Sequence, residues 1–104
     1  MFKAMILLKR REGLSFAEFA DWWLTRHSPM AALLPGVRGV HFNLVDGDGP
    51  FDGVSELWFD TRAEFDAAYA GDHGRAVAAD STSMVSRRER VFVVEHRVVP
   101  VRFD

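Results

Sequence analysis

Apolar residues dominate the start of the chain and then recur at two different spacings. The first nine residues contain Lys3 as their only polar residue before the ninth, and so short an apolar run predicts a buried strand. Residues 37–45 and 54–59 alternate between apolar and mixed positions, which predicts strands with two different faces. Residues 90–101 repeat the alternation and predict a fourth strand.

Two helices are predicted by capping boxes. Ser15 with Glu18, and Thr61 with Glu64, have the spacing at which an N-cap hydroxyl and a carboxylate bind each other's backbone N–H groups. We expect Pro29 to end the first helix, because the residue before a proline is pushed out of the helical conformation. The apolar stripe of this helix is formed by Phe16, Phe19, Ala20, Trp23 and His27.

The second helix places Phe65, Ala68 and Tyr69 on its apolar stripe and resumes over residues 75–83 after two glycines. The resulting order is strand, helix, strand, strand, helix, strand, which is the split βαβ order of the ferredoxin-like fold. We therefore predict a single α+β domain over residues 1–104. It has one antiparallel four-stranded sheet with both helices on one face.

The second face of this sheet lacks a predicted cover. In a monomer that face would be polar, yet either face of the first and last strands carries large apolar residues, such as Ile6 and Phe92 or Met5 and Val91. Leaving a handful of such side chains exposed costs about 1.5–3 kcal/mol each. We expect a homodimer that pairs sheet on sheet, with a fold-over of residues 75–83 or of the C-terminal tail as the alternative.

The amino-acid composition mainly excludes certain kinds of protein and chemistry. The 104 residues are 48% hydrophobic and 27% charged, which is typical of a globular domain. The absence of cysteine excludes disulfides and thiolate chemistry. The longest apolar run, Met5–Leu8, is far shorter than the roughly 20 residues of a membrane span, and Lys9, Arg10 and Arg11 stand where a signal peptide would be cleaved. We expect a cytoplasmic protein without membrane contact.

The charge pattern and the motifs exclude further classes. A net charge of −2 without a basic pole argues against nucleic acid as a partner. The one basic cluster, Arg87, Arg88 and Arg90, is interrupted by Glu89, and we interpret it as a solvated strand entry rather than a phosphate site. HExxH, P-loop, GxGxxG and Ser-x-x-Lys motifs are absent, so we expect neither a metal site nor a cofactor.

His27 is the sharpest candidate for chemistry. It lies at the end of the first predicted helix, on the apolar stripe that faces the sheet. A helix C-terminus favours the imidazolium and burial favours the neutral imidazole, so the two effects oppose each other. Such a group suits general acid or base catalysis in an apolar cleft. The alternative is a structural histidine that caps helix carbonyls.

Other candidates have two interpretations each. One cluster on neighbouring strands is either the polar part of a pocket or a dimer-interface cluster: His41, Asn43, Glu56 and Trp58. Asp80 either faces inward or caps a helix. His73 is expected in an exposed loop, and His96 is expected to be structural. Because Trp22 and Trp23 are adjacent, we expect one in the core and the other toward solvent or a partner subunit.

One combination of motifs covers nearly the whole chain, about residues 3–98. It consists of Trp23 with His27-Ser28-Pro29, Leu34-Pro35-Gly36, Asn43, the run Asp52-Gly53-Val54-Ser55-Glu56-Leu57-Trp58-Phe59, Asp80 and Val94-Glu95-His96. This combination resembles the EthD family of the dimeric α+β barrel superfamily. The segment 81–86 departs from it, being small and polar where an aromatic residue is expected.

The resemblance implies a homodimer whose sheets face each other as a dimeric α/β barrel, with a pocket between sheet and helices in each subunit. It places the recurring histidine of the family at His27. Relatives in the superfamily include isomerases, cyclases, decarboxylases, cofactor-free oxygenases and haem-degrading enzymes, and the EthD name comes from a protein associated with fuel-ether degradation. Haem handling is the weakest of the activities that this kinship suggests.

We therefore predict a homodimer that binds a small apolar or aromatic metabolite in the helix–sheet cleft. It is expected to be a cofactor-independent enzyme of the isomerase, cyclase, decarboxylase or oxygenase type, with His27 as acid or base. The alternative is a non-catalytic accessory or ligand-binding protein of ether or aromatic catabolism. The expected ligand-binding residues are Trp23, Phe42, Asn43, Trp58 and Asp80.

Overall fold

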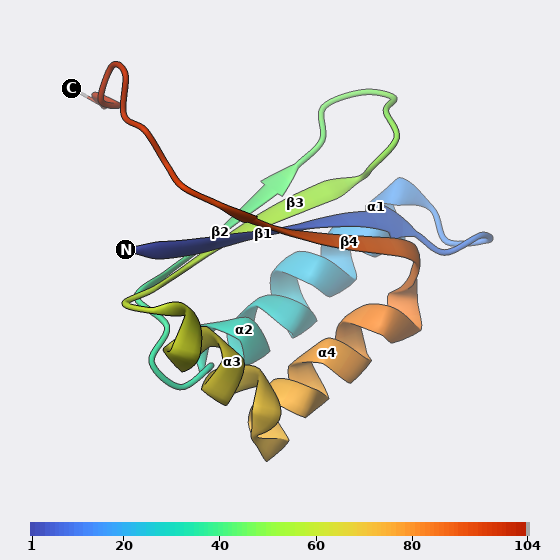
Figure 1. Cartoon of the computed structure of the whole chain (residues 1–104). Helices are drawn as coiled ribbons and strands as arrows, with labels where there is room; N and C mark the ends of the chain where they lie inside the picture. Colours follow the sequence, from blue (N-terminus) through green and yellow to red (C-terminus); the bar gives the residue numbers. More distant parts are fainter. Residues whose placement is uncertain (104) are drawn as a thin grey trace.

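Four antiparallel strands form one sheet in a computed structural model that describes residues 1–103. The strands are β1 (Phe2–Arg10), β2 (Gly39–Leu44), β3 (Gly53–Phe59) and β4 (Val85–Val93), in the spatial order β2-β3-β1-β4 (Figure 1). The two central strands, β1 and β3, are the first and third in sequence, as the split βαβ order requires. The predicted α+β, ferredoxin-like fold is confirmed.

The helices all lie on one face of the sheet (Figure 1). α1 (Phe16–Asp21), a π-helical segment η1 (Trp22–His27) and α2 (Ser28–Ala32) follow one another without a break, and α3 (Arg62–Ala70) is followed by α4 (Asp72–Met84). Each predicted helix is therefore present, but as a chain of shorter pieces. Within residues 1–103, none of these helices is long and apolar enough to cross a membrane.

The capping residues fix where the helices begin. The Ser15 hydroxyl accepts from the backbone N–H of Glu18, and the Glu18 carboxylate accepts from the backbone N–H of Ser15, so this capping box is complete. Thr61 accepts from the backbone N–H of Glu64, which is one half of the second predicted box. The apolar stripe is confirmed at Phe19, while Phe16 lies at the edge and is exposed.

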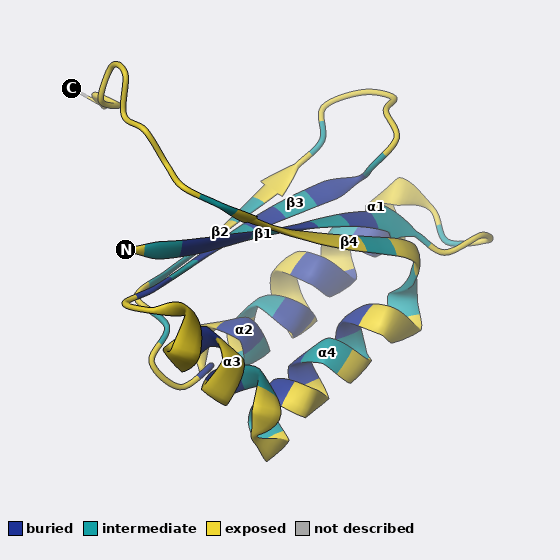
Figure 2. Ribbon diagram, in the orientation of Figure 1, coloured by how far each residue is buried: buried dark blue, intermediate teal, exposed yellow. Residues whose placement is uncertain are grey.

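Strand alternation sorts side chains onto two faces. Ala4, Ile6 and Leu8 of β1 face the helices, and the register places Leu57 opposite Ala4 and Ser55 opposite Ile6. The core lies between this helix face and the helices (Figure 2). Its largest fully buried side chains are Trp23, Phe19, Phe59, Phe65, Leu8 and Leu57.

The opposite side of the sheet, here called the open face, carries the alternate residues. They include Lys3, Met5, Leu7, His41, Asn43, Val54, Glu56, Trp58, Arg87, Glu89, Val91 and Val93. In the part of the chain that the structure describes, no helix covers this face (Figure 1). Val91 is 45% exposed there, in line with the expectation of an apolar surface without cover.

The prediction that Pro29 ends the first helix is wrong. The Ser28 N–H donates to the carbonyl of Trp23, five residues back, which is the spacing of a π-turn. α2 then begins at Ser28, so Pro29 stands in its first turn, where a backbone N–H has no helical partner to lose. Because of the π-turn, the helical conformation continues past Pro29.

The predicted strand over residues 90–101 is also misplaced. β4 begins at Val85 and ends at Val93, and residues 94–103 continue as an extended, exposed tail (Figure 2). Backbone pairing of β4 with β1 ends at the Val93–Lys3 pair, and beyond it the tail contacts the sheet through the Glu95 carboxylate, 2.9 Å from Lys3 Nζ. Alternation without a neighbouring strand does not form a ladder.

Candidate functional site

The π-turn places the ring of Trp22 beside the predicted histidine. A π-turn contains more residues than an α-helical turn. Residues five positions apart therefore lie on the same side of the helix. The rings of Trp22 and His27 are accordingly 5.0 Å apart. Trp22 and Trp23 are both buried, so the expectation that one of them faces solvent or a partner is wrong. The sequence carries no separate indication of this turn.

His27 forms a hydrogen bond with Asp80. The His27 Nδ1 atom lies 2.8 Å from the Asp80 Oδ2 atom, and His27 is 6% exposed. The two residues come from η1 and α4, which pack side by side on the sheet. Both were candidates from the sequence, with Asp80 expected to bind ligand. Their contact with each other is decided by the packing of the helices.

Burial lowers the pKa of His27, and the bond and charge of Asp80 oppose this effect without cancelling it. The imidazole is therefore neutral near pH 7. In a neutral imidazole one nitrogen donates and the other accepts, and a carboxylate at Nδ1 selects the tautomer with the proton there. The lone pair then resides on Nε2, which has no hydrogen-bond partner in residues 1–103. Nε2 is thus able to accept a proton.

Two aromatic residues extend from the histidine along the helix face. Trp23 stacks on Phe42 with the ring centroids 4.3 Å apart and the planes 11° apart, and Phe42 lies 6.0 Å from the His27 ring. Gly53 makes room for the indole, because a Cβ at this position would lie 2.7 Å from the Trp23 ring. The predicted neighbourhood of Trp23, Phe42 and His27 is present.

These residues line a narrow cavity between sheet and helices, here called the His27 cavity. Its lining is mostly apolar, with a few polar groups: Ile6, Leu8, Trp23, His27, Ala31, Phe42, Ser55, Leu57, Tyr69, Val77, Ala78, Ser81 and Arg88. The cavity has room for about one water molecule. A larger ligand would enter by displacing side chains of the lining.

Arg88 is a member of this cavity that the sequence analysis missed. The basic cluster separates, because Arg87 forms an ion pair with Glu89 while the Arg90 guanidinium lies 5.2 Å from the Phe92 ring. Arg88 is half-buried against Tyr69, and burial lowers the pKa of its guanidinium. Alternation counted from Val85 would have placed Arg88 on the same face as Phe92.

Asn43 and Trp58 do not line the His27 cavity. Both lie on the open face, because they alternate with Phe42 and Leu57, which face the helices. The expectation that one cleft holds all the predicted site residues is wrong. The sequence had already grouped Asn43 and Trp58 with His41 and Glu56, and this grouping is present across β2 and β3.

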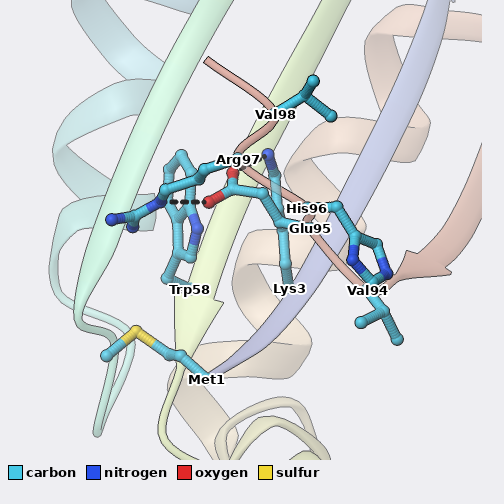
Figure 3. Close-up of a pocket in the computed structure, with 8 residues that line it drawn as sticks. All are labelled: Met1, Lys3, Trp58, Val94, Glu95, His96, Arg97 and Val98. Carbon is cyan, nitrogen blue, oxygen red and sulfur yellow. Dashed lines mark hydrogen bonds and ion pairs between the residues drawn. The ribbon is translucent and has the colours of Figure 1, made fainter. Parts of the chain in front are cut away.

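An ion-pair network occupies this end of the open face. The Lys3 Nζ atom lies 2.7 Å from Glu56 Oε2 and 2.9 Å from Glu95 Oε1, and Asn43 donates to Glu56. Figure 3 shows Lys3 and Trp58 of the sheet beside Glu95 of the tail. Burial lowers the pKa of Lys3, but bonds to and charges of the two glutamates outweigh it, and the pKa is raised. The network attaches the start of the tail to the sheet.

The remaining histidines have other roles. His73 lies in the first turn of α4 rather than in an exposed loop, and its Nε2 atom is 2.7 Å from the carbonyl oxygen of Met30. This contact joins α4 to α2. His96 lies in the exposed tail, outside any strand. In residues 1–103 no group of three or more histidine, aspartate or glutamate side chains is arranged to hold a metal ion.

A protein-family model described as the EthD domain matches residues 11–88, which is three quarters of the chain. This chain belongs to the EthD family. The matched part contains His27 with its partner Asp80, and every polar residue that lines the His27 cavity lies within it. No curated protein sequence matches this EthD protein.

Solved structures share the fold of this EthD protein. A crystal structure of an EthD family protein from Bacillus halodurans has a TM-score of 0.80 at 19% identity, covering 92% of this chain and 100% of that one. A dimeric ferredoxin-like protein of unknown function from Thermobifida fusca has a TM-score of 0.75 at 19% identity, covering 90% of each chain. SnoaB, a cofactor-independent oxygenase from Streptomyces nogalater, has a TM-score of 0.72 at 16% identity, covering 96% and 97%.

Proposed function

We propose that this EthD protein is a homodimeric, cofactor-independent acid–base enzyme that acts on a small apolar or aromatic molecule in the His27 cavity. The observation that carries the proposal is the buried hydrogen bond between His27 and Asp80, 2.8 Å long, at the edge of an apolar cavity. A neutral imidazole held by a carboxylate is a general base whose free nitrogen faces away from its partner.

The proposed step is a proton transfer from the ligand to His27. Nε2 accepts a proton from an acidic C–H or O–H group, and the electron pair of the broken bond stays on the ligand as an enolate or phenolate. The imidazolium that forms is stabilised by the Asp80 carboxylate at Nδ1. Isomerisation, cyclisation, decarboxylation and oxygenation of such molecules can all begin with this step, and the return of the proton completes an isomerisation.

The cavity supports an apolar ligand. The indole of Trp23 and the ring of Phe42 form a stacked pair on one side, and Leu57 and Val77 are buried on others. Removing a ring-sized apolar ligand from water is favourable, and the desolvated site strengthens every charge interaction inside it. SnoaB, which shares the fold, is described as a cofactor-independent oxygenase, and this description supports chemistry without a bound cofactor for the EthD protein as well.

The proposed dimer forms through the open face. Met5, Leu7 and Val54 are half-buried there without a cover in residues 1–103, and Val91 is exposed beside them. Pairing this face with that of a second copy would remove these side chains from water. The Thermobifida fusca protein of the same fold is described as dimeric, which supports this assembly. A cytoplasmic location stays a prediction.

Proton exchange into a bound ligand tests the proposed activity. The EthD protein is incubated in heavy water with a panel of phenols, lactones and keto acids, and deuterium uptake at acidic positions is followed by NMR. We expect uptake with at least one compound, and its loss in His27→Gln, which keeps the size of the side chain but not the base. His41→Gln, on the open face, is the matched control and should retain the exchange.

The accessory function predicts a different result. Compounds would then bind, raise the thermal midpoint and be recovered without deuterium, in the wild type and in His27→Gln alike. That result would contradict the proposed acid–base activity and favour a ligand-binding protein. A haemin titration separates the remaining possibility, because a Soret shift that depends on the protein would indicate haem binding.

A further inference from the structure

Arg88 is a positively charged side chain that forms no ion pair within residues 1–103. It lies on the helix face of β4, where the register places it opposite Leu8, and it lines the His27 cavity. Its Nε atom is buried and has no hydrogen-bond acceptor in residues 1–103. The charged or ionisable groups that act on it are Tyr69 and Arg90, neither of which is a carboxylate.

The buried Nε–H of Arg88 without an acceptor is costly, although the side chain as a whole is only half-buried. An unpaired buried donor loses its hydration without replacement, and the loss is larger for a charged group than for a neutral one. Buried arginines are therefore normally paired with carboxylates or phosphates. The sequence could have supplied such a partner at Ser81 or Ser55 of the same lining, but both positions carry neutral hydroxyls.

The cavity contains a second donor of the same kind. Trp23 is fully buried and lines the cavity, and its Nε1 atom has no acceptor in the described part of the chain. An indole N–H and a guanidinium can only donate. Two side chains of one lining thus lack acceptors, so a ligand that fits this cavity is expected to supply oxygen acceptors, and its negative charge would offset that of Arg88.

We infer that Arg88 makes the His27 cavity a site for an oxyanion, so that the ligand of this EthD protein is a small aromatic or cyclic molecule bearing one carboxylate, enolate or phenolate oxygen. The inference rests on the proposed function for its site and extends it to the class of substrate. Arg88 binds the negative oxygen, and the apolar lining receives the ring.

Arg88 and His27 would act on the same molecule in different ways. A proton taken by His27 leaves negative charge on the oxygen of the enolate or phenolate, and a guanidinium already in place stabilises that charge as it develops. The positive charge of Arg88 also contributes, after burial and against the effect of Asp80, to lowering the pKa of His27. The same side chain thus helps keep the base unprotonated.

Matched probes of equal shape test this inference. Benzoate and benzamide differ mainly in charge, and their binding to the purified full chain is measured by calorimetry. We expect the wild type to bind benzoate about tenfold or more tightly than benzamide, since a charge-assisted hydrogen bond contributes at least this factor. Arg88→Gln should lose the preference. Arg87→Gln, one residue away on the opposite face and exposed, is the control and should keep it.

The outcomes are decisive in both directions. Equal affinity for the two probes in the wild type, no binding of either, or a preserved preference in Arg88→Gln would overturn the inference. If Arg88→Gln fails to fold, Arg88→Lys replaces it. This variant keeps the charge but loses the planar fork, so weaker benzoate binding supports the inference and unchanged binding contradicts it.

A second pair of probes identifies the source of the oxyanion. Benzoate carries its charge in water, whereas phenol acquires it only on loss of a proton. Binding of benzoate alone indicates a carboxylate substrate, and binding of phenol that depends on both Arg88 and His27 indicates a phenolate formed in the site. Failure of the proposed catalysis can be distinguished from failure of this inference. In the first case deuterium exchange is absent while the Arg88-dependent preference for benzoate persists.

Discussion

His27 and Asp80 are 53 positions apart in the sequence, and their side chains meet at 2.8 Å between Nδ1 and Oδ2. The histidine comes from the only π-turn of residues 1–103, and the aspartate from the middle of α4. The carboxylate has two effects that can be measured apart. It fixes which nitrogen carries the proton, and it raises the pKa of an imidazole that burial would otherwise lower further.

Replacing Asp80 separates these effects. In Asp80→Asn the negative charge is lost, so we expect the pKa of His27 to fall below its wild-type value and any His27-dependent exchange to slow by about tenfold or more. NMR titration of the imidazole gives the pKa. Asp72→Asn, at the exposed start of the same helix, is the control and should leave the His27 titration unchanged. A raised His27 pKa in Asp80→Asn would contradict the assignment.

Stability is expected to fall on mild acidification because of His27. Its pKa in the folded state is below the unfolded value of 6.5, so the unfolded state binds protons first as the pH falls. The contribution is complete above pH 6.5 and is lost progressively as the pH drops toward the folded pKa. Urea midpoints measured from about pH 7.5 to about pH 5 should decline less steeply in His27→Gln than in wild type. An equal decline in the wild type and in His27→Gln would show that another titrating group causes the loss of stability in acid.

Gly53 is predicted to be intolerant of any side chain. A Cβ would lie 2.7 Å from two atoms of the Trp23 ring, which is fully buried and stacked on Phe42. We expect Gly53→Ala to destabilise the fold by about 1–3 kcal/mol through overpacking and to disturb the His27 cavity. Thermal unfolding measures the loss. Gly49→Ala, where the nearest atom would be at an ordinary 3.6 Å, should change stability little.

Arg88 is predicted to cost stability in the free protein. Since its buried Nε lacks an acceptor, Arg88→Gln should raise the free energy of unfolding by up to about 1 kcal/mol, or a few degrees in thermal midpoint. The same variant is expected to bind benzoate less tightly. A gain of stability together with a loss of binding is the mark of a group retained for a ligand. A clear loss of stability would instead indicate a structural role for Arg88.

The proposed dimer depends on the open face. Val91→Glu introduces a charge at a position that is 45% exposed in the single chain, so the fold should persist while the dimer dissociates to a particle of 11.8 kDa. Light scattering after size exclusion gives the mass. Leu33→Glu, at a position that is 72% exposed and outside the sheet, is the matched control and should not change it. A wild type that is already monomeric in concentrated solution would contradict the dimer.

Local patterns were sufficient for much of the fold. Each capping box needs only two side chains three residues apart, and both predicted helix starts are present, at Ser15 and Thr61. Alternation along β3 correctly separated Leu57 from Trp58, because the period of a strand is a property of its own backbone. The apolar stripe of the first helix likewise predicted that Trp23 and His27 lie on the helix surface that faces the sheet.

These local patterns could not predict the register between strands or the contacts between residues that are distant in the sequence. Alternation continues past Val93 in the sequence, but the backbone pairing of β4 with β1 ends at the Val93–Lys3 pair. The helix continues past Pro29 because of a π-turn, which no capping or periodic pattern in the sequence predicts. Both errors arise because the deciding partner, a neighbouring strand or a shifted helical turn, is not adjacent in the sequence.

The sequence by itself determined the order of the elements, the two faces of each strand and the candidates His27 and Asp80, since these follow from spacing along the chain. Only the tertiary structure decided that these two side chains meet, that Arg88 joins them, and that Asn43 and Trp58 lie on the opposite side. The physical reason is that a site is assembled from elements whose mutual positions are set by packing of the whole core.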